Sequence, residues 1–332
     1  MNKGITILAE EVRLVDKDKR LYEVIVDDEL GIVDGAHTVK LIEEAQDEGR
    51  IPPEQHVEVY IKTGIESSFV SDIAKGLNTG MQVKAQAIFN IDGVFDWLKD
   101  EIKDMPYAKL ISWKESDSGE YDVRDIISVL ECFNVTDFPN ESGKHPISAY
   151  EKWSVPLEKF GKDFKDNFRG GTGQSKYLKL RPLLREALYL HDLIRHDFRV
   201  VHNSQGGAAG KMKIVEEASQ RKGTFAFPFA PSLSHERYRL TKGALYPILA
   251  AFRNCVSSNK RTGNAEWIRG FDGVLELWDE AGPELVHETY LATREIGPNP
   301  DQIGKSRNHW ANLYKTLELR MLRRAVREDR RG

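Results

Sequence analysis

The sequence predicts an α+β (or α/β) protein, with an α/β domain over residues 1–140 and a mostly helical domain over residues 141–332. Two observations lead to this prediction. The first ~100 residues alternate between short apolar runs and helical patterns, which is typical of strands and helices packed in layers. After residue 140, prolines and glycines punctuate a loop-rich stretch, and long segments with helical spacing of apolar residues follow.

Short apolar runs mark four expected strands in the first domain, at residues 5–9, 21–26, 31–33 and 56–62. The last run (HVEVYIK) alternates apolar and polar side chains, as a half-buried strand does. A helix is expected from Thr38, where apolar residues begin to recur at helical spacing, and the prolines at 52 and 53 exclude its continuation. A second helix is expected over residues 69–77.

Helices dominate the expected second domain. Pro182 to Phe198 carries apolar residues at helical spacing, and proline is well tolerated in the first turn of a helix. The same spacing predicts further helices at residues 246–256, 273–281, 283–295 and 308–328.

The composition is that of a folded protein with little net charge. Of 332 residues, 40% are hydrophobic and 30% are charged, and the formal net charge is −4. No global positive field therefore draws the chain to nucleic acid or anionic lipid, and any such contact needs a local patch. Cys132 and Cys255 are the only cysteines, too few for a disulfide framework or a thiolate zinc site.

The sequence favours a cytoplasmic protein without membrane contact. No stretch approaches the roughly 20 apolar residues that are needed to cross a bilayer. Met1 to Gly4 lacks the apolar core of a signal peptide. Two cysteines without a framework fit a reducing cytosol.

The sharpest motif is Gly31 to Thr38 (GIVDGAHT), where a strand stops at Asp34-Gly35 and turns at once into a helix. Such a turn leaves helix N–H groups unpaired, and together with the helix dipole they form a site for a phosphate or another anion. Gly35 permits close approach of a ligand, and His37 or Thr38 can hydrogen-bond a phosphate oxygen. The alternative is that Asp34 caps the helix and Gly35 only supplies the turn.

Residues 78–83 (NTGMQV) form a second candidate site. Asn78, Thr79 and Gln82 are uncharged side chains that can read a nucleotide or a DNA backbone. The alternative is that Gly80 serves as the C-terminal cap of the preceding helix.

Other patterns imitate ligand sites without fitting them. Residues 170–176 (GGTGQSK) and 205–212 (QGGAAGKM) look like phosphate-binding loops. The first has its lysine and serine in the wrong order, and in the second Gln205 takes the first glycine position and Met212 replaces the hydroxyl, so flexible loops are expected. His191-Asp192 and His196-Asp197 look like metal-binding doublets. Their separation by five residues puts them on different faces of a helix, so we expect no metal site.

The expected last helix becomes basic towards its end. A local patch of this kind can attract DNA phosphates against the net charge, and it gives weak, salt-sensitive binding. The alternative is that acidic neighbours at helical spacing pair with the arginines and the helix end is merely solvated. The candidate contacts to nucleic acid are Arg320, Arg323, Arg324 and Arg327.

Three of these stretches together resemble the abortive-infection phage-resistance (AIPR) family. Residues 2–9 (NKGITILA) are similar to its "NNGIT" strand, residues 31–38 to its "IVNGxQT" turn and residues 78–83 to its "NTQxxV" segment. Asp34 and His37 replace the usual Asn and Gln of the turn. The three matches occur in order and at consistent spacing. The resemblance is good over residues 1–100 and weaker over residues 125–153.

The turn also resembles the Asp-Gly-Gln-His-Arg turn of DndB-type proteins and of relatives of the ParB/sulfiredoxin fold. That likeness implies a ParB/sulfiredoxin-like first domain in which Asp34, Gly35, Ala36, His37 and Thr38 hold nucleotide phosphates. Thr38 stands where those proteins carry arginine, and a hydroxyl offers no charge-assisted hydrogen bond.

The AIPR resemblance implies a bacterial anti-phage defence protein that binds nucleic acid or a nucleotide through the turn. Lys3, Thr6, Asn78, Thr79 and Gln82 would then share a concavity with the turn, and Mg²⁺ would accompany a nucleotide.

Two alternatives stay open. The same site could belong to a metal-dependent nucleotide hydrolase or nuclease, for which clustered carboxylates are needed. Glu10, Glu11, Asp27 and Asp28 are available for that role. The protein could instead be a non-catalytic module that binds a protein partner or forms a homo-oligomer. Family members usually carry a long region before the "NNGIT" strand, often with a nuclease-like domain. We therefore expect this chain to be a short member or a fragment.

Overall fold

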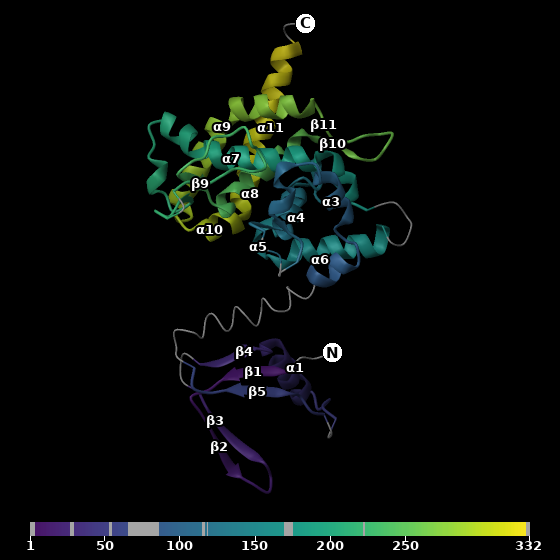
Figure 1. Cartoon of the computed structure of the whole chain (residues 1–332), viewed down its shortest axis with the longest axis vertical. Helices are drawn as coiled ribbons and strands as arrows, with labels where there is room; N and C mark the ends of the chain where they lie inside the picture. The colour runs from purple at the N-terminus through teal and green to yellow at the C-terminus, as the bar shows by residue number, and fades with distance from the viewer. Residues whose placement is uncertain are drawn as a thin grey trace. The chain divides into compact units, whose positions relative to one another are not determined.

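The protein combines helices with small sheets, which confirms the α+β prediction. The computed structural model describes residues 4–26, 30–52, 55–65, 86–114, 117, 119–168, 175–221 and 223–329. The chain divides into two compact units, residues 1–86 and 87–332 (Figure 1).

The first unit is built on a three-stranded sheet of order β4-β1-β5 (Figure 1). Strand β1 (Ile5–Leu8) lies in the middle, antiparallel to β4 (Gly31–Asp34) and parallel to β5 (Val59–Lys62). Helix α1 (Ala36–Asp47) follows β4 directly. Strands β2 (Glu11–Asp16) and β3 (Leu21–Ile25) form an antiparallel hairpin that extends away from this sheet.

Four of these strands were expected from the sequence, and β2 was not. Its charged sequence, EVRLVD, hides the alternation, and four of its six residues are exposed. The expected helix at 69–77 lies outside the described residues.

The second unit is mostly helical and also contains short two-stranded sheets. Its α-helices are α3 (Asp96–Ile102), α4 (Val123–Cys132), α5 (Ser148–Glu151), α6 (Ser154–Asp163), α7 (Leu184–Ser204), α8 (Lys242–Ala251), α9 (Gly270–Glu295), α10 (Pro300–Lys305) and α11 (Arg307–Asp329). Its strands are β6 (Ile111–Ser112), β7 (Tyr121–Asp122), β8 (Val215–Glu217), β9 (Tyr238–Leu240), β10 (Val256–Ser258) and β11 (Ala265–Trp267).

Helix α8 is the centre of the second unit. Every residue from Gly243 to Ala251 is buried, so this helix is apolar all round, as a fully enclosed helix must be. Helices α7, α10 and α11 pack against it. The core also takes in residues before position 140, among them Phe95, Leu130 and Phe133. The two compact units therefore differ in extent from the expected division near residue 140.

One helix replaces two expected ones. The sequence predicted a break at Gly282-Pro283, yet α9 runs through both residues. Proline removes a single helical hydrogen bond at that point. Buried residues on both sides, Trp278 before it and Leu285 after it, hold the two halves against the same core.

Candidate functional site

The turn after β4 has the predicted course. The strand ends at Asp34, Gly35 adopts a left-handed conformation with φ of 86°, and α1 begins at Ala36, two residues before the expected start. The Asp34 carboxylate accepts a hydrogen bond from the N–H of Gly35 at 2.8 Å. Among the described residues, the Asp34 carboxylate therefore bonds the N–H of Gly35, the N-cap residue of α1, rather than an N–H of the helix's first turn, as the capping alternative required.

Gly35 is fixed by close backbone packing. A Cβ atom at this position would lie 2.6 Å from the carbonyl oxygen of Gly4 and 2.9 Å from Cα of Ile5. Gly4 is equally constrained, because its own Cβ would lie 2.2 Å from the carbonyl oxygen of Glu58. The two glycines thus let the turn, β1 and the entry to β5 approach one another.

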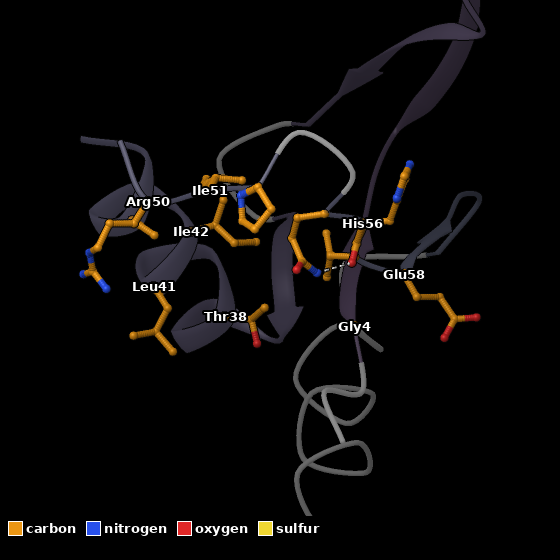
Figure 2. A pocket seen from close by; sticks show the side chains of 12 residues that line it. Gly4, Thr38, Leu41, Ile42, Arg50, Ile51, His56 and Glu58 are labelled. Carbon is orange, nitrogen blue, oxygen red and sulfur yellow. Dashed lines mark hydrogen bonds between the residues drawn. The ribbon is translucent and has the colours of Figure 1, made fainter. Parts of the chain in front are cut away.

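A pocket of about 430 Å³ lies next to this turn (Figure 2). The α1 residues Thr38, Leu41 and Ile42 lie on one side, and His56 and Glu58 lie on the other, near Gly4. The full lining is Gly4, Thr38, Leu41, Ile42, Ala45, Arg50, Ile51, Pro52, Gln55, His56, Val57 and Glu58. This volume is within the range of small-molecule sites, and an apolar wall with a few polar groups is their usual lining.

Several polar groups of the pocket have partners within the first unit. Arg50 forms an ion pair with Glu48. The Gln55 amide donates to the carbonyl oxygen of His56 at 2.9 Å. The carbonyl oxygen of Glu58 accepts from the N–H of Ile5 at 2.8 Å, which ties the pocket wall to β1. Thr38, with its hydroxyl, lines the pocket from the first turn of α1.

The structure brings together only some of the predicted site residues. Thr38 lines the pocket, whereas Thr6 is 8% exposed and is paired with Asp34 between β1 and β4. The expected Lys3, Asn78, Thr79 and Gln82, like the side chain of His37, lie outside the described residues.

Sequence reasoning missed most of the pocket wall. Residues 56–58 belong to the strand expected at 56–62, but the stretch before them carries no motif that indicates a pocket wall. Only the folded chain shows that this segment faces α1.

The basic end of α11 is partly neutralised by α9. Arg320 lies 2.8 Å from Glu284, and Arg324 pairs with Glu276 and Glu328. The acidic partners are therefore mainly on another helix, which spacing along one helix does not reveal. Arg323 and Arg327 have no ion-pair partner in the part of the chain that the structure describes, and both are exposed. These two retain an uncompensated charge.

The patterns that imitate ligand sites have structural partners. His191 Nδ1 lies 2.9 Å from Asp192 in the core, where burial lowers the pKa of His191. From the glycine-rich stretch 170–176, Ser175 donates to Asp163 at 2.6 Å and Lys176 pairs with Asp137. No group of three or more His, Cys, Asp or Glu side chains suited to a metal ion occurs among the described residues.

Within the described residues, no helix is long and apolar enough to span a membrane.

Comparison with known proteins gives one result that covers both units. No curated protein gives a significant match, and neither does any solved structure. A protein-family model described as AIPR protein matches residues 1–296, so the match extends from β1 to the end of α9. The chain therefore belongs to the AIPR family, whose name associates it with abortive-infection resistance to phage.

Proposed function

We propose that this AIPR-family protein serves anti-phage defence by binding a nucleotide, either free or within a nucleic acid, in the pocket beside Thr38. The observation that carries the proposal is the meeting of two surfaces in one pocket. The first turn of α1 reaches the pocket at Thr38, and an apolar wall continues from it along the same helix.

The first of these surfaces suits a phosphate. Backbone N–H groups at a helix N-terminus, together with the helix dipole, attract anions. The Thr38 hydroxyl adds a hydrogen-bond donor next to them. The charge of Arg50 is shared with Glu48, so the pocket offers directed donors rather than strong positive charge.

The second surface suits a base. Leu41 is 51% exposed and Ile51 is 36% exposed, although both line the pocket. A planar heterocycle placed between them would remove apolar surface from water, at roughly 25 cal/mol for each Å². A ligand that carries a phosphate and a base would use both surfaces at once.

The test is a thermal-shift and calorimetric titration of the full chain with nucleoside triphosphates, a 5′-phosphorylated oligonucleotide and inorganic phosphate, each with and without Mg²⁺. A ligand that binds only the folded protein raises the unfolding temperature. We expect Thr38→Val to weaken binding about tenfold, because one hydrogen bond to a charged group is worth roughly 1.5 kcal/mol or more. Thr38→Ser keeps the hydroxyl and should bind as the parent does.

Leu41→Asn separates the two surfaces, because it removes apolar surface without adding a charge that would repel phosphate. It should weaken nucleotides more than inorganic phosphate, since phosphate does not reach the apolar wall. A parent protein that none of these ligands stabilises would contradict the proposal, as would equal affinity for Thr38→Val and Thr38→Ser.

A further inference from the structure

In the second unit, hydrogen bonds link the side chains of a serine, a histidine and an aspartate in a row. His196 and Asp197 lie on α7, and Ser234 lies on residues 223–237, a segment that we call the strap. His196 Nε2 is 3.1 Å from Oγ of Ser234, and His196 Nδ1 is 2.6 Å from Oδ1 of Asp197. Nucleophilic serine sites are built on this order of hydroxyl, imidazole and carboxylate, each within hydrogen-bond reach of the next.

The carboxylate of Asp197 determines which nitrogen carries the proton. An ionised carboxylate only accepts hydrogen bonds, so Nδ1 of His196 donates to it, and Nε2 of the neutral ring keeps its lone pair. The hydroxyl of Ser234 then donates to Nε2. This is the direction in which the histidine takes the serine proton as a general base.

Neighbouring side chains hold these groups in place. Nε1 of Trp278 donates to Oδ2 of Asp197 at 3.0 Å, so both carboxylate oxygens are engaged. Phe227 packs edge-on against the His196 ring, with 5.1 Å between the centroids. Glu236 is a weaker competitor, since its Oε1 lies 3.4 Å from the Ser234 hydroxyl and 3.9 Å from Nε2 of His196.

The strap itself is closed by its own backbone. Phe225 and Glu236 exchange two hydrogen bonds, of 2.7 and 3.1 Å, across its ends. Its middle is anchored where the N–H of Phe229 donates to Asp192 at 2.8 Å. Ser234 is therefore carried by a loop that is fixed at both ends and in the middle.

Access to solvent distinguishes the two His-Asp doublets of α7. His191 is 2% exposed, and its partner Asp192 anchors the strap from inside the core. Ser234 is exposed, and the His196 side chain is 13% exposed. Only the second doublet therefore presents a hydroxyl that a substrate can reach.

We propose that Ser234, His196 and Asp197 form a nucleophilic site that hydrolyses carboxylic esters, an activity independent of the nucleotide pocket. Ser234 Oγ attacks the ester carbonyl carbon, and its proton passes to Nε2 of His196. As the ester C–O bond breaks, that proton moves to the departing alkoxide, which leaves an acyl group on Ser234. Water, deprotonated by His196, then cleaves the acyl group as a carboxylic acid and restores the serine hydroxyl. Water is the only co-reactant.

A fluorophosphonate probe and 4-nitrophenyl acetate test this site on the full chain. We expect the probe to modify Ser234, as located by peptide mapping, and the ester to be hydrolysed. Ser234→Ala should abolish both. Asp197→Asn should slow both about 100-fold, because it reverses the preferred tautomer of the histidine. The matched control is Ser232→Ala on the same strap, where the hydroxyl lies 3.4 Å from that of Tyr189; it should behave as the parent does.

Peptide mapping of the parent decides the matter without any variant, so a Ser234→Ala protein that fails to fold leaves the test intact. Absence of label on Ser234, under conditions that label a known serine hydrolase, overturns the proposal. So does a folded Asp197→Asn variant that reacts at the parent rate. In either case the contacts between His196 and Ser234 serve only to anchor the strap to α7.

Discussion

Gly35 lies so close to Gly4 and Ile5 that its lack of a side chain is required by the fold itself. The sequence suggested that this glycine permits close approach of a ligand. The contacts indicate instead that a Cβ atom would meet the backbone of Gly4 and Ile5, at 2.6 and 2.9 Å. Substitution at Gly35 therefore tests the sheet, and Thr38 is the better probe of the pocket.

We predict that Gly35→Ala destabilises the first unit by roughly 1–3 kcal/mol, because it combines backbone strain at positive φ with the clash against β1. Gly49→Ala is the matched control, since Gly49 also has positive φ (64°), but a Cβ atom added there would meet nothing within 4 Å. Hydrogen exchange of the β1 and β4 amides measures the difference. Equal protection in the two variants would show that the close approach of β1 contributes nothing.

His309 is expected to make the second unit sensitive to acid. It is 3% exposed, and burial lowers its pKa from 6.5 to about 4. Below pH 6.5 the unfolded chain therefore binds a proton that the folded chain refuses. Stability is complete above that pH and is lost as the pH falls towards 4, by up to about 3 kcal/mol.

The measurement is the free energy of unfolding in denaturant between neutral pH and pH 4. His309→Gln should flatten the pH dependence, whereas His235→Gln, at an exposed position on the strap, should leave it unchanged. A His309→Gln variant with the parent's slope would assign the acid sensitivity to other groups.

At the scale of elements, the spacing of apolar residues correctly predicted those helices whose formation depends on local sequence. The helix after β4 and the long α7 follow from the spacing of their apolar residues, and both are present. The break expected at Pro283 is absent because packing on both sides of the proline overrides its local preference. Strand β2 was missed because its residues are mostly exposed, and an exposed strand carries little hydrophobic pattern to detect.

The pairing between α9 and α11 sharpens the proposal that the basic helix end contacts nucleic acid. We predict that a double Arg323→Ala, Arg327→Ala variant binds a DNA duplex more weakly and reduces the salt slope by about 0.9 for each phosphate that is no longer neutralised. Arg320 and Arg324 already pair with acidic residues. The matched double variant at those positions should therefore change DNA affinity less.

Titrations at several salt concentrations distinguish the outcomes. If both double variants bind DNA with the parent's affinity and slope, the end of α11 is a solvated helix stabilised by α9. A larger loss of affinity in the Arg320 and Arg324 variant would mean that DNA displaces their glutamate partners.

At the scale of the whole molecule, the two compact units are expected to fold separately. Among the described residues, the main core cluster runs from Val94 to Leu317 and includes no residue of the first unit. We predict that residues 87–332, produced alone, unfold in one cooperative thermal transition close to that of the same unit in the full chain. A fragment that lacks such a transition would show that the first unit contributes to the second unit's stability.

The sequence predicted the α+β class and the turn, because both depend on local signals: strand and helix periods, and a glycine where the chain reverses. It could not predict the pocket wall at residues 50–58 or the meeting of His196 with Ser234. The pocket wall carries no motif, and His196 and Ser234 are distant in the sequence, so only packing of the folded chain brings these groups into place. Helix geometry argues against a shared metal site at the two His-Asp doublets, but it gives no information about the strap that contacts both of them.

The central place of β1 in its sheet has a consequence for how the chain is made. The ribosome produces this strand before both of its neighbours, which are completed only at Asp34 and Lys62. Both edges of this short apolar strand stay open until β4 is complete, and one edge until β5 is, at a synthesis rate of about 5–20 residues per second. The three-stranded sheet, unlike the β2–β3 hairpin, therefore cannot assemble from strands that follow one another in the chain. This sheet closes in a late step, and in the interval before it the nascent chain is most open to chaperones and to pairing with other chains.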